Sequence, residues 1–71
     1  MENIEFSLTG EYIELIKLLK TLSIAQTGGH AKMIVEDELV VRNGEIETRK
    51  RAKLIKGDTL IIDNQITVKI I

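Results

Sequence analysis

Positive charge is concentrated in one short stretch of this 71-residue chain. Five basic side chains fall within eight residues: Arg49, Lys50, Arg51, Lys53 and Lys56. Arginine binds phosphate through two parallel hydrogen bonds, whereas a lysine ammonium acts as a point charge. The stretch is therefore suited to contact with a polyanion, although a solvated loop is the simpler interpretation of any basic run taken alone.

The two parts of the chain differ in charge. Residues 1–48 hold nine acids and four bases, which gives −5, and residues 49–71 hold two acids and six bases, which gives +4. The sum is the net charge of −1. Such asymmetry indicates an electrostatic face rather than a uniformly charged surface.

A second candidate for anion binding is a predicted helix start at Thr27. This N-cap residue precedes Gly28, Gly29 and His30, and a helix start without bulky side chains exposes N–H groups that attract phosphate. An ordinary capped helix is the simpler alternative. Lys32 should point outward from this helix, so the helix start, Lys32 and the basic run are expected to line one groove.

Other kinds of chemistry find little support. There is no Cys and a single His, so a metal site lacks the three or four ligands it needs, and no Ser lies in a nucleophile motif. We therefore expect no enzyme activity, metal, cofactor or small-molecule substrate. No apolar run approaches the roughly 20 residues of a membrane span, and the acidic N-terminus lacks the basic start of a signal peptide, so a cytoplasmic protein without a membrane partner is expected.

The first half of the chain predicts a strand and two helices. A short strand is indicated where Ile4, Phe6 and Leu8 alternate with polar residues. Residues 11–22 carry a wide apolar stripe at helical spacing and are predicted as a helix capped by Thr9. Residues 28–37 are predicted as a second helix, of which one face should pack on the first. That inner face consists of Ala31, Ile34 and Val35.

Two hairpins are predicted in the second half. Asn43-Gly44 between residues 39–42 and 45–48 is a strong signal for a type I′ turn, which would place Arg42 opposite Glu45. The expected core side consists of Leu39, Val41 and Ile46, and the outer side of Val40, Arg42, Glu45 and Glu47. The basic run should be a loop anchored by Leu54 and Ile55. A second hairpin, residues 59–62 and 65–71, should turn at Asp63-Asn64.

The order of these features resembles a known family. Thr27 to Val35, the Asn43-Gly44 hairpin and the later Lys56-Gly57-Asp58 together resemble the small RNA-binding domain first defined in ribosomal protein S-four, also called the alpha-L motif. The segment from Glu45 to Lys53 is similar to the stand-alone YaaA/YbcJ-like bacterial members. The resemblance covers about residues 6–62, and the length of the chain allows one domain over residues 1–71. The expected fold is α+β, with a short N-terminal strand, two packed helices and two β-hairpins that form a small sheet.

The resemblance also implies a binding site. The corresponding positions are Thr27, Gly29, His30, Lys32, Arg49, Lys50, Arg51 and Lys53, and it leaves the roles of Arg42 and Lys56 open. This chain departs from the family at Gly28, where Arg is frequent, and at Glu38, where Gly is usual. A side-chain phosphate contact at Gly28 would have to be replaced by backbone N–H groups.

The sequence thus predicts a non-catalytic, monomeric RNA-binding module of a bacterial cytoplasm, with ribosomal RNA as one candidate partner. Aromatic residues number only two, which disfavours a reader of single strands and favours structured RNA. The alternative is a small protein–protein interaction domain. A ubiquitin-like sulfur carrier is disfavoured, because such proteins end in Gly-Gly and this chain ends in Ile70-Ile71.

Overall fold

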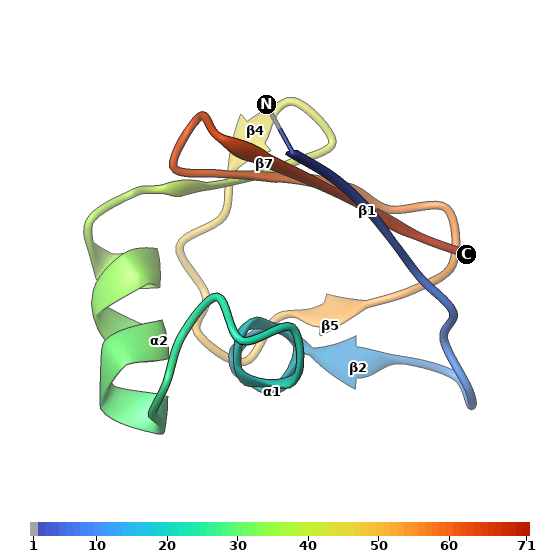
Figure 1. The fold of residues 1–71 in the computed structure, drawn as a ribbon, viewed down its shortest axis with the longest axis horizontal. Coiled ribbons are helices and arrows are strands. Elements are labelled where there is room, and N and C mark those ends of the chain that lie inside the picture. The colour runs from blue at the N-terminus through green and yellow to red at the C-terminus, as the bar shows by residue number, and fades with distance from the viewer. Residues whose placement is uncertain (1) are drawn as a thin grey trace.

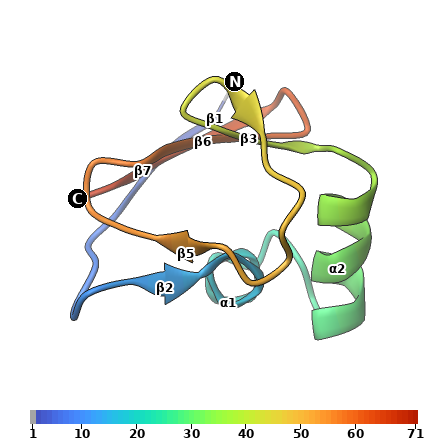
Figure 2. The same ribbon diagram turned by 180° about the vertical axis from the view of Figure 1, so that it is seen from behind.

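A five-stranded mixed sheet covers a layer formed by two helices and a two-stranded ribbon (Figure 1; Figure 2 shows the opposite side). The computed structural model describes residues 2–71. In chain order the elements are β1 (Glu2–Phe6), β2 (Ile13–Glu14), α1 (Leu15–Thr21), α2 (Gly28–Glu36), β3 (Val40–Arg42), β4 (Glu45–Ile46), β5 (Lys53–Leu54), β6 (Thr59–Ile62) and β7 (Ile66–Ile70). The predicted α+β class, with a short first strand, two packed helices and two hairpins, is confirmed.

Aliphatic side chains join the strands of the large sheet to the helical layer. The strand order is β1-β7-β6-β3-β4, with β1 parallel to β7 and the other pairs antiparallel. Ile4, Val68 and Leu60 face one another across three neighbouring strands, and Val68 and Leu60 are fully buried. Opposite them lie the buried leucines of α1, namely Leu15, Leu18 and Leu19.

Helix α2 forms where its sequence predicts. The Thr27 hydroxyl caps it by accepting the His30 N–H at 3.0 Å, and Ala31, Ile34 and Val35 are buried as expected. The helix is followed by Glu38 in the left-handed conformation, at φ 59°. A residue other than Gly there costs roughly 1 kcal/mol, which the surrounding structure offsets.

The first helix begins later than predicted. Residues 11–14 are not helical and Thr9 is not its cap, because Ile13 and Glu14 pair as β2 with Leu54 and Lys53 of β5. The N–H of Leu15 then donates to the carbonyl of Ala52 at 2.9 Å. A strand of two residues is too short to show an alternating pattern, so the helical pattern of the sequence included residues 13 and 14.

The first hairpin has the predicted register, but the side predicted to face solvent faces the core. Asn43 and Gly44 have φ of 51° and 89°, and Val41 pairs with Ile46. The predicted core side is wrong, because Val40 is fully buried whereas Ile46 is 52% exposed. Arg42 shares the inner face with Val40, since both lie opposite inward-facing residues of β6. Hydrophobicity alone favours an inner face that contains Val41 and Ile46, with Arg42 exposed to water.

The other two predicted turns are confirmed, and one of the two predicted anchors of the basic stretch is wrong. The second hairpin forms between β6 and β7 about Asp63 and Asn64, and Gly57 makes the preceding turn with φ 98°. Leu54 anchors the basic stretch as predicted, but Ile55 is exposed. Ala52 is the second anchor instead, because the β2–β5 pairing turns its side chain inward.

Within residues 2–71, no helix combines the length and hydropathy that a bilayer crossing requires.

Candidate nucleic-acid interface

A buried carboxylate at the start of β6 fixes one end of the basic stretch. Asp58 is 6% exposed. Its oxygens accept hydrogen bonds from Arg42 Nη2 at 2.8 Å, Asn43 Nδ2 at 2.9 Å and the Ile55 N–H at 2.9 Å. Burial raises the pKa of Asp58, but the hydrogen bonds from Ile55, Asn43 and Arg42 outweigh it and hold the pKa below its ordinary value of 3.8.

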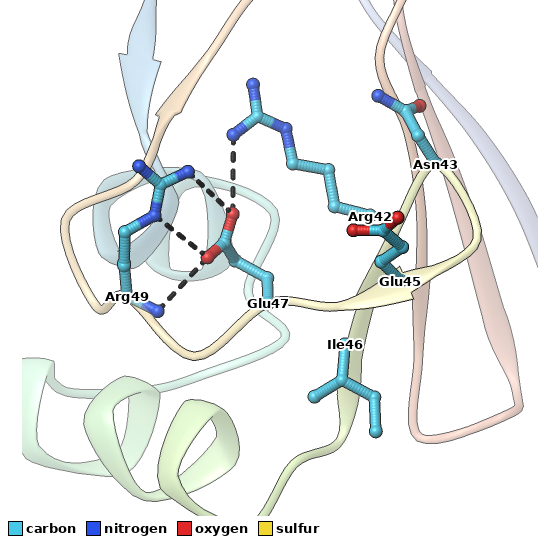
Figure 3. Close-up of a pocket in the computed structure, with 6 residues that line it drawn as sticks. All are labelled: Arg42, Asn43, Glu45, Ile46, Glu47 and Arg49. Carbon is cyan, nitrogen blue, oxygen red and sulfur yellow. Dashed lines mark hydrogen bonds and ion pairs between the residues drawn. The ribbon is translucent and has the colours of Figure 1, made fainter.

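Arg42 connects Asp58 to a second buried carboxylate. Its Nη1 donates to Glu47 Oε1 at 3.3 Å, and its Nη2 also donates to the Lys53 carbonyl at 2.8 Å. Arg42 lies opposite Glu45 in the hairpin, as predicted, but its guanidinium points inward to these acceptors. Figure 3 shows Arg42 and Arg49 approaching the Glu47 carboxylate from two sides, with Ile46 directed away. The guanidinium therefore spans both ends of residues 47–58.

Glu47 determines the conformation at the beginning of the basic stretch. Its Oε2 accepts from the Arg49 N–H at 3.1 Å and from Arg49 Nε at 3.2 Å. The side-chain hydrogen bond from Arg49 is the main reason that the pKa of Glu47 lies below its ordinary 4.5. The same contact raises the pKa of Arg49. Arg49 is 72% exposed but remains tied to Glu47, so its charge is partly neutralised within the protein.

Acid should destabilise the fold through these two carboxylates. Their folded pKa values lie below the ordinary 4.5 of Glu47 and 3.8 of Asp58. Their stabilising contribution is therefore complete above the unfolded-state values and is lost as the pH falls through the folded ones. We expect the thermal midpoint, followed by circular dichroism, to be nearly constant down to about pH 5 and then to fall.

Asp58→Asn provides the matched comparison. This variant should have a lower midpoint at neutral pH and a smaller further decrease between about pH 5 and pH 3, because one of the two linked carboxylates is absent. Equal acid dependence in both proteins would show that Asp58 does not contribute to it.

Four cations from three elements surround one shallow hollow of about 560 Å³. They are Lys17, Lys20, Lys32 and Arg51. The sequence placed Lys32 and Arg51 near each other but assigned no role to the two lysines of α1. Their spacing of three residues, which puts both on one side of a helix, is the signal that was available. Only the folded chain shows that this side of α1 meets the basic stretch.

Two ion pairs tie the basic stretch to the end of α2 and to β2. Lys50 Nζ is 2.7 Å from Glu36 Oε1, and Arg51 Nε is 3.1 Å from Glu14 Oε2. Hydrogen bonding by Lys50 is the main cause of the lowered pKa of Glu36. Exposed ion pairs of this kind contribute little to stability, in general about 0–1 kcal/mol. These two pairs therefore hold Lys50 and Arg51 in place only weakly.

The predicted site residues at the start of α2 do not all lie on the same side of the helix. Gly28 and Gly29 lie in the first turn, whose N–H groups have no intrahelical acceptor, and space around a Cβ added at Gly28 is open. His30 lies about 200° around the helix from Lys32. Its Nδ1 accepts the Gln26 N–H at 3.3 Å, and its ring lines a separate hollow beside Ile34 and Ile66. The structure thus brings together Lys32 and the basic stretch, but not His30.

The last predicted site residue, Lys53, lies in β5 and does not line the hollow that the four cations surround. Its ammonium is 5.0 Å from the centroid of the Tyr12 ring, within the distance of a cation–π contact. Within residues 2–71, no three or more His, Cys, Asp or Glu side chains are grouped so as to hold a metal ion.

The geometry defines a small α+β domain with a cationic surface between its helices and a basic stretch. The S4 domain profile matches residues 6–71. Over 49 residues, which are 69% of this chain and 70% of the relative, the chain is 37% identical to the Escherichia coli (strain K12) protein named "Putative RNA-binding protein YbcJ". A Shigella flexneri protein, named "Uncharacterized protein YbcJ", matches with the same identity and coverage. The chain belongs to the S4 domain family.

Proposed function

We propose that this protein binds structured RNA without catalysis, through the surface that surrounds the cationic hollow. The observation that carries the proposal is the convergence of Lys17, Lys20, Lys32 and Arg51 from α1, α2 and the basic stretch. Phosphates supply much of the affinity of proteins for nucleic acid, and clustered Lys and Arg side chains neutralise them. Membership of the S4 domain family and similarity to YbcJ, whose name describes RNA binding, support the same function.

The predicted site residues take different roles in this proposal. Lys32, Lys50, Arg51 and Lys53 bind phosphate through their side chains. Thr27 caps α2, and Gly29 offers a backbone N–H at the helix start. Arg49 contacts RNA from its position against Glu47. His30 is a peripheral contact, reached only by an RNA that passes around the start of α2.

The structured character of the RNA follows from the scarcity of aromatic side chains. Proteins that bind single strands stack successive bases on several rings, and this chain has only Phe6 and Tyr12, of which Phe6 is partly buried against the core. A surface of this type instead recognises backbone and shape. Ribosomal RNA in the cytoplasm, bound by a monomer, is the partner that fits the family resemblance.

The test is binding to a structured RNA over a range of salt concentrations. The logarithm of the association constant should fall linearly with the logarithm of the salt concentration, with a slope of about −0.7 to −0.9 for each phosphate contact. Recovery of the native protein from cells, with and without ribonuclease, tests the alternative of a protein–protein interaction domain. Partners that persist after ribonuclease, together with no salt-dependent RNA binding, would overturn the proposal.

Gly28→Arg should increase RNA affinity. Its added side chain meets no atom within 4 Å of its Cβ, and it places a guanidinium at a helix start that already attracts anions. One further phosphate contact should steepen the salt slope by about 0.7–0.9. Gly28→Ala serves as the control, because it changes the helix start without adding charge. Equal binding by both variants would place the RNA away from the start of α2.

A further inference from the structure

Tyr12 occupies an unexpected position for an aromatic residue. It precedes β2 at the edge of the cationic surface, and it is 45% exposed rather than packed in the core. The ammonium of Lys53 lies over its ring, at 5.0 Å from the centroid. Single exposed apolar side chains are common on protein surfaces, so the informative feature of Tyr12 is the position of its ring beside the cations. Tyr12 therefore presents an aromatic surface to whatever the neighbouring cations bind.

A second hollow, of about 350 Å³, borders Tyr12 and adjoins the cationic hollow. It is lined by Tyr12, Ile13, Glu14, Lys17 and Arg51. Glu14, Lys17 and Arg51 also line the larger hollow, so the two hollows are neighbours. Lys53 does not line the smaller hollow, although its ammonium lies over the Tyr12 ring.

We infer that this smaller hollow receives a single unpaired nucleobase, which stacks on Tyr12 while its flanking phosphates contact Lys53 and Lys17. Bases that leave an RNA helix stack on aromatic rings or on arginine guanidinium planes, and here Tyr12 and Arg51 offer both. The carboxylate of Glu14 accepts hydrogen bonds only, so it suits an amino group on the base edge.

This inference rests on the proposed function and makes it more specific. One exposed ring accommodates one base, which distinguishes the surface from a single-strand reader with several rings. The RNA class is then a helix with a bulge or a flipped nucleotide beside the paired region. Backbone contacts in the cationic hollow position such an RNA, and the base on Tyr12 supplies local discrimination.

Two RNA duplexes that differ only in one base test the inference. Both carry a single-nucleotide bulge, adenosine in one and an abasic nucleotide in the other, so their phosphates are equal in number. Wild-type protein should bind the adenosine bulge about 5- to 150-fold more tightly, the range that corresponds to stacking of one base. Tyr12 is the only Tyr in a chain without Trp, so stacking should also quench the intrinsic tyrosine fluorescence.

Two substitutions separate the ring from its hydroxyl. Tyr12→Leu should bind the two duplexes equally, with the salt slope of the wild type, whereas Tyr12→Phe should keep the preference for adenosine. Circular dichroism and thermal melts of both variants establish that they are folded. Equal binding of both duplexes by the wild type with a normal salt slope, or a preference that survives in Tyr12→Leu, overturns this inference alone. Absence of binding to either duplex overturns the proposed function with it.

Discussion

Replacement of Arg42 by Met is expected to lower the free energy of unfolding by about 3–5 kcal/mol, the range found when one partner of a buried ion pair is removed. Arg42 and its partners are mostly inaccessible, with side-chain exposures of 19% for Arg42 and 8% for both Glu47 and Asp58. Met fills much of the same volume but donates no hydrogen bond. The buried carboxylates of Glu47 and Asp58 would then lack the cation that pairs with both of them.

This loss is large relative to the stability of so small a domain. At roughly 0.05–0.15 kcal/mol per residue, a chain of this length has a total stability of about 4–11 kcal/mol. Chemical denaturation followed by circular dichroism should therefore show a much lower midpoint for Arg42→Met, or an unfolded protein. Arg42→Lys should recover only part of the loss, because one ammonium cannot replace three guanidinium nitrogens directed at different acceptors.

Arg51→Met is the matched control for Arg42→Met. The side-chain change is the same, but Arg51 is 80% exposed and pairs with the partly exposed Glu14. Such a pair contributes about 0–1 kcal/mol, so the denaturation midpoint should change little. Similar losses in the two variants would contradict the central position that the structure gives to Arg42.

Removal of the four cations of the hollow is expected to reduce RNA affinity by roughly 10³-fold at about 0.1 M salt, if each one contacts a phosphate. The variant changes Lys17, Lys20, Lys32 and Arg51 to Gln. Four lost contacts should make the salt slope shallower by about 2.8–3.6, because each contributes about 0.7–0.9. Fluorescence anisotropy of a labelled structured RNA, measured at several salt concentrations, provides both quantities.

Single substitutions show which element contributes. Lys17→Gln and Lys20→Gln test the surface of α1, and Lys32→Gln tests that of α2. Lys69→Gln is the control for net charge, since Lys69 is exposed on β7 between the buried Val68 and Ile70 and faces away from the helices. It should leave the affinity almost unchanged. If Lys69→Gln weakens binding as much as the hollow variants do, the attraction is a property of total charge and the hollow is not the site.

Features whose signals lie within a few residues of one another could be predicted from the sequence. The Thr27 cap and the burial of Ala31, Ile34 and Val35 follow from helical geometry, because the interacting residues are three or four positions apart. The Asn43-Gly44 turn and the pairing of Val41 with Ile46 follow from the backbone angles that only certain residues adopt. The ordered combination of these features was sufficient to indicate the S4 domain family and the cationic stretch.

Contacts between residues far apart in the chain could not be predicted and became visible in the folded protein. Arg42 turns toward the core because Asp58, sixteen positions later, accepts its hydrogen bonds, so a strand with two plausible inner faces took the less hydrophobic one. The short pairing of β2 with β5 shortened α1 and left Tyr12 exposed beside Lys53. It also placed Arg51 against Glu14, beside the lysines of α1. Neither helical periodicity nor local charge contains this information, because long-range partners are chosen by the packing and hydrogen bonding of the whole chain.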